Sequence, residues 1–102
     1  MATEFEKKVY AVVRKVPKGR VTTYSAVAHA MGSKAYRAVG LALSKNPSHL
    51  ETPCHRVVGS DGSLKNWAWG VDGKIAALKA EGVNVEKGKI ANFDQVVILK
   101  LN

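Results

Sequence analysis

Apolar residues recur at helical spacing near the start of the chain, and this repeat constrains the fold more than any other feature. They lie three or four positions apart, which places them on one face of an amphipathic helix. A proline and a glycine follow directly, and both residue types end helices. The residues of this apolar face are Phe5, Val9, Val12, Val13 and Val16, with Pro17 and Gly19 as the stop.

Two shorter helices are expected after the first. Thr22 or Thr23 can cap a helix that ends at Gly32, and a third helix is predicted from about residue 34 to residue 45. Two short helices joined by a glycine-containing turn predict a helix-turn-helix, whose second helix would face DNA. The residues expected to be buried by these two helices are Val27, Ala30, Met31, Val39 and Leu43.

The outward face of the third helix is expected to carry mostly small side chains. Ala35, Ala38 and Ala42, with Gly40 nearby, leave a strip of small residues from which Arg37 projects. Such a strip lets a helix approach a groove wall, with the arginine as a probe. The alternative is that the alanines reflect helix propensity alone.

Helical periodicity is absent from residues 46–70, where prolines and glycines recur. Long irregular segments within a small domain tend to be functional. Beyond them, Asp72 is expected to cap a helix that contains Ile75 and Leu78 and ends at Gly82. The tail beyond this helix alternates loosely and finishes with Val96-Val97-Ile98-Leu99, and a small hairpin packed on the helices is expected there. The predicted fold is mainly α, a winged-helix-like helix-turn-helix bundle with a small β element.

The positive charge is concentrated in the first half of the chain. The 102 residues include 16 Lys and Arg against 8 Asp and Glu, and residues 1–50 hold nine of the basic and two of the acidic ones. A one-sided basic surface suits a polyanion such as nucleic acid, or serves only as a solubilising face. No apolar run approaches the roughly 18 residues of a membrane span, and one cysteine cannot form an internal disulfide. An intracellular location, in the cytoplasm or nucleus, is expected.

The run Pro53-Cys54-His55-Arg56-Val57 holds the only cysteine. A thiol with a pKa of about 8.5 needs a base or a positive field to act as a nucleophile. His55 could serve only through a turn or a bridging water, and Arg56 could act electrostatically. The alternative is a small buried hydrophobic residue. One Cys and three His lack the paired spacing of a zinc site, so no metal is expected.

Six segments together resemble the C-terminal active-site domain of the O6-alkylguanine-DNA alkyltransferases, also called methylated-DNA–protein-cysteine methyltransferases. The resemblance covers about residues 4–85 in one colinear order. The segments are Gly19-Arg20-Val21-Thr22-Thr23-Tyr24, Arg37-Ala38-Val39-Gly40, Asn46-Pro47, Pro53-Cys54-His55-Arg56-Val57-Val58, Asp61-Gly62 and Glu81-Gly82.

The resemblance implies a DNA repair protein that flips out a damaged guanine and moves its O6-alkyl group onto Cys54, in a single irreversible turnover without a cofactor. Glu81, His55 and a water would withdraw the thiol proton, and Asn46 would hold the active-site turn. Arg37 would fill the vacated base stack from the minor groove. The resemblance also implies a catalytic and DNA-binding role for Tyr24, a DNA surface of Thr23, Ala38, Gly40 and Arg56, and a base pocket of Val57, Trp67, Ala68 and Trp69.

Two departures from the family pattern stand out. Full-length relatives usually carry an additional N-terminal domain, which this chain is expected to lack, so a single domain over residues 1–102 is expected. The family's Asn-Tyr-Ser-Gly-Gly-like segment reads Asn66-Trp67-Ala68-Trp69-Gly70, which is expected to narrow the pocket toward small alkyl groups. The two tryptophans could alternatively be ordinary packing residues.

Two other functions are considered. Alkyltransferase-like proteins bind the lesion without repair and signal to excision-repair proteins, usually with Trp in the position of Cys54. A plain helix-turn-helix regulator would explain the charge but leave Cys54, His55 and Glu81 without a role. The expected partner is double-stranded DNA that contains O6-alkylguanine, bound by a monomer, with no membrane association.

Overall fold

The computed structural model describes residues 3–46, 51–64 and 71–101, and its first helix, α1, spans Glu4–Val13. A capping box starts α1. The Thr3 hydroxyl accepts a hydrogen bond from the Glu6 N–H at 3.1 Å, and the Glu6 carboxylate accepts one from the Thr3 N–H at 2.8 Å. Val9 and Val13 are fully buried, as the apolar repeat predicts.

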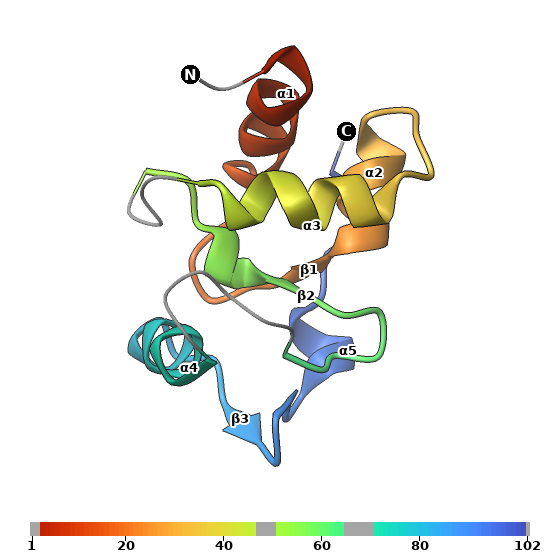
Figure 1. Ribbon diagram of the computed structural model, residues 1–102. Helices are drawn as coiled ribbons and strands as arrows, with labels where there is room; N and C mark the ends of the chain where they lie inside the picture. The colour runs from red at the N-terminus through yellow and green to blue at the C-terminus, as the bar shows by residue number, and fades with distance from the viewer. Residues whose placement is uncertain (1–2, 47–50, 65–70, 102) are drawn as a thin grey trace.

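Helix α2 (Tyr24–Ala30) begins and ends at the residues that the sequence indicated. The Thr23 hydroxyl accepts a hydrogen bond from the Ala26 N–H at 3.0 Å and caps the helix. The turn after α2 contains Gly32 at a φ of 72°, a left-handed conformation in which a side chain is strained. The chain reverses in this turn and continues into the next helix (Figure 1).

Helix α3 (Tyr36–Ser44) starts two residues later than predicted. The Ser33 hydroxyl accepts a hydrogen bond from the Ala35 N–H at 3.0 Å, which extends the preceding turn. Val39 and Leu43 are 0% and 4% exposed, as expected of an apolar pair one turn apart. Helices α1, α2 and α3 pack against one another and form the helix-turn-helix unit.

A short parallel strand pair connects this unit to the middle of the chain. A single turn of 3₁₀-helix, η1 (Cys54–Arg56), leads into β2 (Val57–Val58). Strand β2 pairs in parallel with β1 (Thr22–Thr23), in the register that sets Thr22 opposite Val57. Strand β1 leads directly into α2 and η1 leads directly into β2, so in this parallel pair the start of α2 and the cysteine turn lie at opposite ends of the paired strands (Figure 1).

Helix α4 (Val71–Ala80) packs against η1. The prediction that Asp72 caps this helix is wrong, because Asp72 lies inside the first turn. Its negative charge there still interacts favourably with the positive end of the helix dipole. Leu78 is fully buried. The helix stops as predicted: Gly82 has a φ of 85°, and the Val83 N–H donates to the Leu78 carbonyl at 3.0 Å.

The hairpin expected at the end of the chain forms earlier, between β3 (Val85–Glu86) and β4 (Lys89–Ile90). The connecting residues, Lys87 and Gly88, have φ values of 51° and 76°. Two left-handed residues in sequence suit the tight turn of a two-residue hairpin. The tail therefore contains the expected hairpin, but residues 96–99, with which the tail finishes, are not part of it.

The C-terminal segment instead returns to the centre of the molecule. A short helix, α5 (Phe93–Val96), is followed by Val97, which forms a parallel bridge with Val21. The Ile98 N–H donates to the Val21 carbonyl at 2.7 Å, and the Thr22 hydroxyl donates to the Ile98 carbonyl at 2.6 Å. The tail thus covers the outer side of β1.

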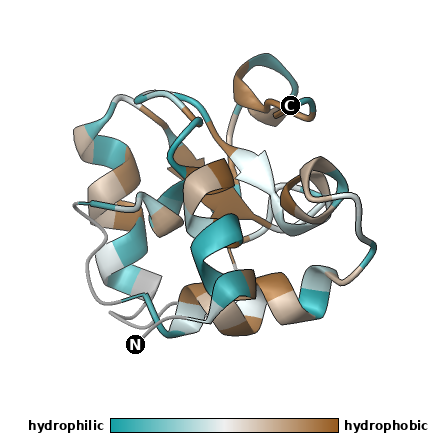
Figure 2. Cartoon of the chain, turned by 90° about the horizontal axis from the view of Figure 1, so that it is seen from above, coloured by the Kyte–Doolittle hydropathy of each residue, from teal (hydrophilic) through white to brown (hydrophobic). Residues whose placement is uncertain are grey.

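Two clusters of buried side chains make the core. The larger one lies among α1, α2, α3 and η1 and includes Cys54; the smaller one contains Val21, Val58, Leu78, Val83 and Ile90. Figure 2 shows hydrophobic and hydrophilic segments alternating along the helices, as amphipathic helices require. The mainly α, helix-turn-helix prediction is confirmed. Within the described residues, no helix has the length and apolar character needed to cross a membrane.

One buried hydrogen bond couples α1 to α3 and tests this packing. The Tyr10 hydroxyl donates to the Ala42 carbonyl at 2.7 Å. We expect Tyr10→Phe to lower the free energy of unfolding by about 1 kcal/mol, because a buried carbonyl loses its best partner. Urea unfolding measures the change. The control is Tyr36→Phe, whose side chain is half exposed; equal effects of the two substitutions would contradict this account.

Candidate active site and nucleic-acid surface

The η1 turn points three consecutive side chains in three directions. A 3₁₀-helix has about three residues per turn, so Cys54, His55 and Arg56 project roughly 120° apart. Cys54 is 2% exposed and points into the main core cluster, and His55 is 4% exposed. Cys54 and His55 thus lie on a turn and not in an extended strand.

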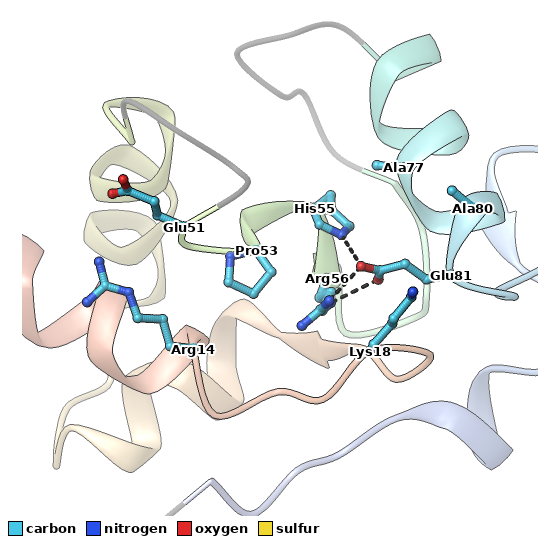
Figure 3. A pocket seen from close by; sticks show the side chains of 9 residues that line it. All are labelled: Arg14, Lys18, Glu51, Pro53, His55, Arg56, Ala77, Ala80 and Glu81. Atoms are coloured by element: carbon cyan, nitrogen blue, oxygen red, sulfur yellow. Dashed lines mark hydrogen bonds and ion pairs between the residues drawn. The ribbon is translucent and has the colours of Figure 1, made fainter.

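The side chains of His55 and Arg56 both contact the carboxylate of Glu81, which directly follows α4 (Figure 3). The Arg56 guanidinium binds its carboxylate in a bidentate manner, with Nε at 2.9 Å from Oε1 and Nη2 at 2.5 Å from Oε2. The His55 Nε2 lies 3.1 Å from Oε2. The third guanidinium nitrogen, Nη1, donates to the Val16 carbonyl at 2.7 Å. The guanidinium of Arg56 is thus directed inward, and this residue is left out of the DNA surface that the sequence predicted.

The environment of Glu81 keeps its carboxylate ionised. Burial by itself raises the pKa, but the hydrogen bonds and positive charges of Arg56 and His55 outweigh burial and hold the pKa of Glu81 below its ordinary value. An ionised carboxylate beside Nε2 favours a proton on that nitrogen. The Nδ1 nitrogen of His55 is then the basic one.

A cleft of about 620 Å³ opens beside this ion pair. It lies between the end of α1, the η1 turn and the end of α4, and Figure 3 shows His55, Arg56 and Glu81 on one wall. Cys54 is not among the residues that line it. The cleft therefore gives solvent access to the histidine and the carboxylate rather than to the thiol. Its lining residues are Arg14, Lys18, Glu51, Pro53, His55, Arg56, Ala77, Ala80 and Glu81.

The backbone of Thr52 anchors the chain just before the cysteine. Its carbonyl accepts hydrogen bonds from the Asn46 side-chain amide at 2.9 Å and from the Cys54 N–H at 2.7 Å. Its hydroxyl accepts a hydrogen bond from the Arg14 Nε at 3.1 Å. Asn46, 5% exposed, thereby ties the end of α3 to the active-site turn, and this geometry supports the role expected from the resemblance. Thr52 itself was missed, because a backbone acceptor has no sequence signature.

Lys74 is a second residue that the sequence analysis missed. It is fully buried on α4, and its ammonium donates to the Val57 carbonyl at 2.7 Å. Burial lowers the pKa of Lys74 to about 8, although the negative charge of a Cys54 thiolate acts in the opposite direction. Its position four residues before the buried Leu78 was the available signal, since residues at this spacing share a helix face.

Tyr24 lies between the helix-turn-helix and this buried lysine. The centre of its ring is 5.9 Å from the Lys74 ammonium, and the Gly40 backbone of α3 lies against the same ring. Burial, with a smaller contribution from the Cys54 charge, raises the pKa of Tyr24 to about 12. The phenol is therefore neutral near pH 7.

The exposed face of α3 agrees only in part with the outward face that was predicted from the sequence. Arg37 is exposed, with its guanidinium 6.0 Å from the centre of the Tyr36 ring. Ala35 is exposed and Ala38 half-buried. The prediction for Ala42 is wrong: it is 2% exposed, because that side of the helix packs on α1.

Three further predictions concern residues away from this exposed face. Thr23 was expected to contact DNA, but it is 3% exposed and its hydroxyl serves as the α2 cap. Trp67, Ala68 and Trp69 lie outside the described residues. Val57, expected in the base pocket, is fully buried, and its carbonyl accepts a hydrogen bond from Lys74. Within residues 3–46, 51–64 and 71–101, no three His, Cys, Asp or Glu side chains gather as metal ligands would.

The fold and the site together define a class: a helix-turn-helix nucleic-acid-binding domain with a buried thiol next to a histidine–carboxylate pair. The family model for the DNA-binding domain of 6-O-methylguanine DNA methyltransferase matches residues 4–83. The methylated-DNA–protein-cysteine methyltransferase of Methanosarcina barkeri is 45% identical over 84 residues, which cover 81% of this chain and 53% of that protein. The chain therefore belongs to the 6-O-methylguanine DNA methyltransferase family, and it spans about half the length of the curated relatives it matches.

Two solved structures show the same architecture. The OGT protein of Mycobacterium tuberculosis in complex with DNA superposes with a TM-score of 0.77 at 35% identity, covering 80% of this chain and 51% of that one. S. pombe Atl1, in complex with damaged DNA containing O6-carboxymethylguanine, has a TM-score of 0.83 at 29% identity, covering 96% of this chain and 98% of that one.

The lowered pKa of Lys74 predicts that the free energy of unfolding depends on pH in the alkaline range. Below pH 8 the lysine is protonated in both the folded and the unfolded chain. Between pH 8 and its ordinary value of 10.5 the unfolded chain binds more protons, so stability rises with pH. We expect the free energy of unfolding to gain about 2 kcal/mol between pH 7.5 and 9.5. Lys74→Met should remove this rise in urea unfolding, whereas the exposed control Lys79→Met should keep it.

The lowered pKa of Glu81 predicts a second pH dependence of stability, of the same sign but at acid pH. Its pKa is lowered in the folded chain, so its stabilisation is present above the unfolded value of about 4.3 and is lost as the pH falls through the folded value. We expect Glu81→Gln to cost about 2 kcal/mol at pH 7, because the inward-facing Arg56 loses its counter-charge. The difference from wild type should shrink below pH 4. A constant difference, or an equal effect of the exposed Glu4→Gln, would refute this assignment.

Proposed function

We propose that this domain transfers an alkyl group from O6 of guanine in double-stranded DNA to the sulfur of Cys54. It would then be an active-site domain as well as a DNA-binding domain, acting as a single unit over residues 1–102 and as a monomer. The observation that carries the proposal is the 3.1 Å contact between His55 Nε2 and Glu81, in the turn that begins at Cys54. Family membership supports it.

The proposed chemistry assigns a task to each group. Glu81 holds the Nε2–H of His55, which leaves Nδ1 to accept the thiol proton, directly or through a water. The thiolate sulfur attacks the alkyl carbon, so the S–C bond forms as the C–O6 bond breaks. The leaving guanine takes up a proton and becomes ordinary guanine. Lys74, close enough for its charge to interact with that of Cys54, would favour the anionic sulfur.

The reaction would occur once per molecule. The product is a thioether, which has no good leaving group. The chain has no second cysteine to attack it. Alkylated Cys54 is therefore the final state.

The helix-turn-helix would deliver the base. Extruding a nucleotide from the duplex costs a few kcal/mol, and a side chain inserted into the stack offsets part of this cost. Arg37, exposed on α3, is the proposed inserted residue, with Ala38 and Gly40 along the same helix against the groove. Tyr24, beside both Gly40 and Lys74, would assist the flipped guanine. Trp67, Ala68 and Trp69 are proposed to border the base and to favour small alkyl groups.

The similarity to Atl1 supports a second candidate function. That structure matches nearly the whole of both chains, and its DNA contains an O6-alkylated guanine. A domain of this kind could recognise the lesion and pass it to excision-repair proteins without any transfer. The presence of Cys54, His55 and Glu81 in one array favours transfer.

Intact-mass spectrometry after mixing with duplex DNA that contains O6-methylguanine separates the two functions. With lesion in excess, we expect each protein molecule to gain about one methyl group, located on Cys54, and then to stop. Cys54→Ser should bind the DNA without a mass change, because a serine hydroxyl is too weakly acidic for a histidine relay. Binding without a mass change by the wild type selects the lesion-binding function, and turnover beyond one equivalent rules out irreversible transfer.

A further inference from the structure

A small hollow lies on the helix-turn-helix, between α2 and the start of α3. Its volume is about 220 Å³. Ser25 and His29 line it from α2, Lys34 from the connecting turn and Tyr36 from the first position of α3. These four side chains are exposed, and the buried Ala28 also lines the hollow.

The hollow is preformed by the backbone of the turn. The Gly32 N–H donates to the His29 carbonyl at 2.9 Å, and the Ser33 N–H donates to the Ala28 carbonyl at 2.9 Å. The Ser33 hydroxyl in turn holds the Ala35 N–H at 3.0 Å. These bonds fix the backbone of the turn relative to α2, so a ligand would meet a main chain that needs no rearrangement.

The chemistry of the lining suits an anion with several oxygen atoms. It offers an ammonium group, two hydroxyl groups and an imidazole, and no carboxylate lines it. The sequence between residues 7 and 50 contains no Asp or Glu at all. Phosphate oxygens accept hydrogen bonds from all of these groups, and Lys is a common point-charge partner of phosphate.

The hollow lies directly beside the proposed base-displacing residue. Tyr36 lines the hollow, and the Arg37 guanidinium lies 6.0 Å from the centre of the Tyr36 ring. This distance is at the outer limit of a cation–π contact. An anion held by Lys34 and Tyr36 would therefore sit one residue away from Arg37. Contacts to phosphate set the register of a protein on a duplex without reading its sequence.

We propose that this hollow, the Ser25–Tyr36 notch, seats a phosphate group of the DNA backbone and thereby sets where Arg37 meets the base stack. The inference deepens the proposed function and rests on it. A phosphate can belong to a DNA strand or be free in solution. The position of the notch on the helix-turn-helix, next to Arg37, favours the strand.

The salt dependence of DNA binding tests the notch. In Cys54→Ser protein, which binds without reacting, the affinity for an undamaged duplex is measured by fluorescence anisotropy over a range of salt concentrations. Lys34→Gln should weaken binding several-fold and reduce the slope of log Kd against log salt by about one, as expected for one lost phosphate contact. Tyr36→Phe should weaken binding without a change in slope, because it removes only a neutral hydrogen bond.

A matched control is Lys87→Gln, at the tip of the β3–β4 hairpin, which should leave the slope unchanged. An unaltered slope in Lys34→Gln would overturn the proposal. Inorganic phosphate, titrated by calorimetry without DNA, distinguishes the two sources. Tight phosphate binding that Lys34→Gln abolishes, together with an unaltered duplex slope, would assign the notch to a free anion and also overturn it.

The proposed function has its own readout, methyl transfer to the wild-type chain by intact mass. If transfer occurs and the Lys34→Gln slope is unaltered, only the notch is wrong. If the slope falls by about one and no transfer occurs, the phosphate contact stands and only the chemistry is wrong.

Discussion

One guanidinium group connects the three segments on which the site is built. Arg56 binds both oxygens of Glu81 at the end of α4 and the Val16 carbonyl just beyond α1. A planar group with fixed donors suits this task, since it fixes direction as well as distance. The η1 turn then has one orientation relative to α4, and His55 meets the same carboxylate as a result. Removal of this pairing would deprive the histidine of its contact with the Glu81 carboxylate.

A second positive charge lies on the other side of the same turn. Lys74 is fully buried and binds the Val57 carbonyl, directly after η1. A buried ammonium group is unfavourable for folding, because burial penalises its charged form. It lies near Tyr24, and its charge interacts with that of Cys54. In the proposed transfer a cation here would favour the anionic sulfur, so stability and the proposed reactivity make opposite demands on position 74.

The sequence predicted the elements that have a repeat or a cap. The apolar face of α1, the Thr23 cap and the Gly32 stop all follow from local physics. Ala42 was misplaced because alanine is compatible with either face of a helix, and only packing on α1 decides. Thr23 and Arg56 were assigned to DNA because a polar side chain does not reveal whether its partner is internal. The two-residue strands and four-residue α5 are too short to show any periodicity.

The candidate site was predictable for a different reason. Cys54, His55 and Glu81 were assigned through the resemblance to a family, because 27 positions separate the cysteine from the carboxylate and no spacing rule joins them. Lys74 was missed because lysines are expected at the surface, and here tertiary packing overrides that expectation. Thr52 acts through its carbonyl, which every residue type possesses.

The two-residue pairing of β1 with β2 fixes the position of the helix-turn-helix, proposed to contact DNA, relative to the turn that holds Cys54. Helix α2 begins with Tyr24 directly after β1, and the 3₁₀ turn that contains Cys54 ends directly before β2. A slip of a single residue would displace them relative to each other by about 3.3 Å, roughly the length of two carbon–sulfur bonds. Insertions and deletions should therefore be rare between residue 22 and the start of α2, and between Cys54 and residue 58. The turn at Lys87 and Gly88 belongs to the separate β3–β4 pair, so a change in its length would leave this register unaltered.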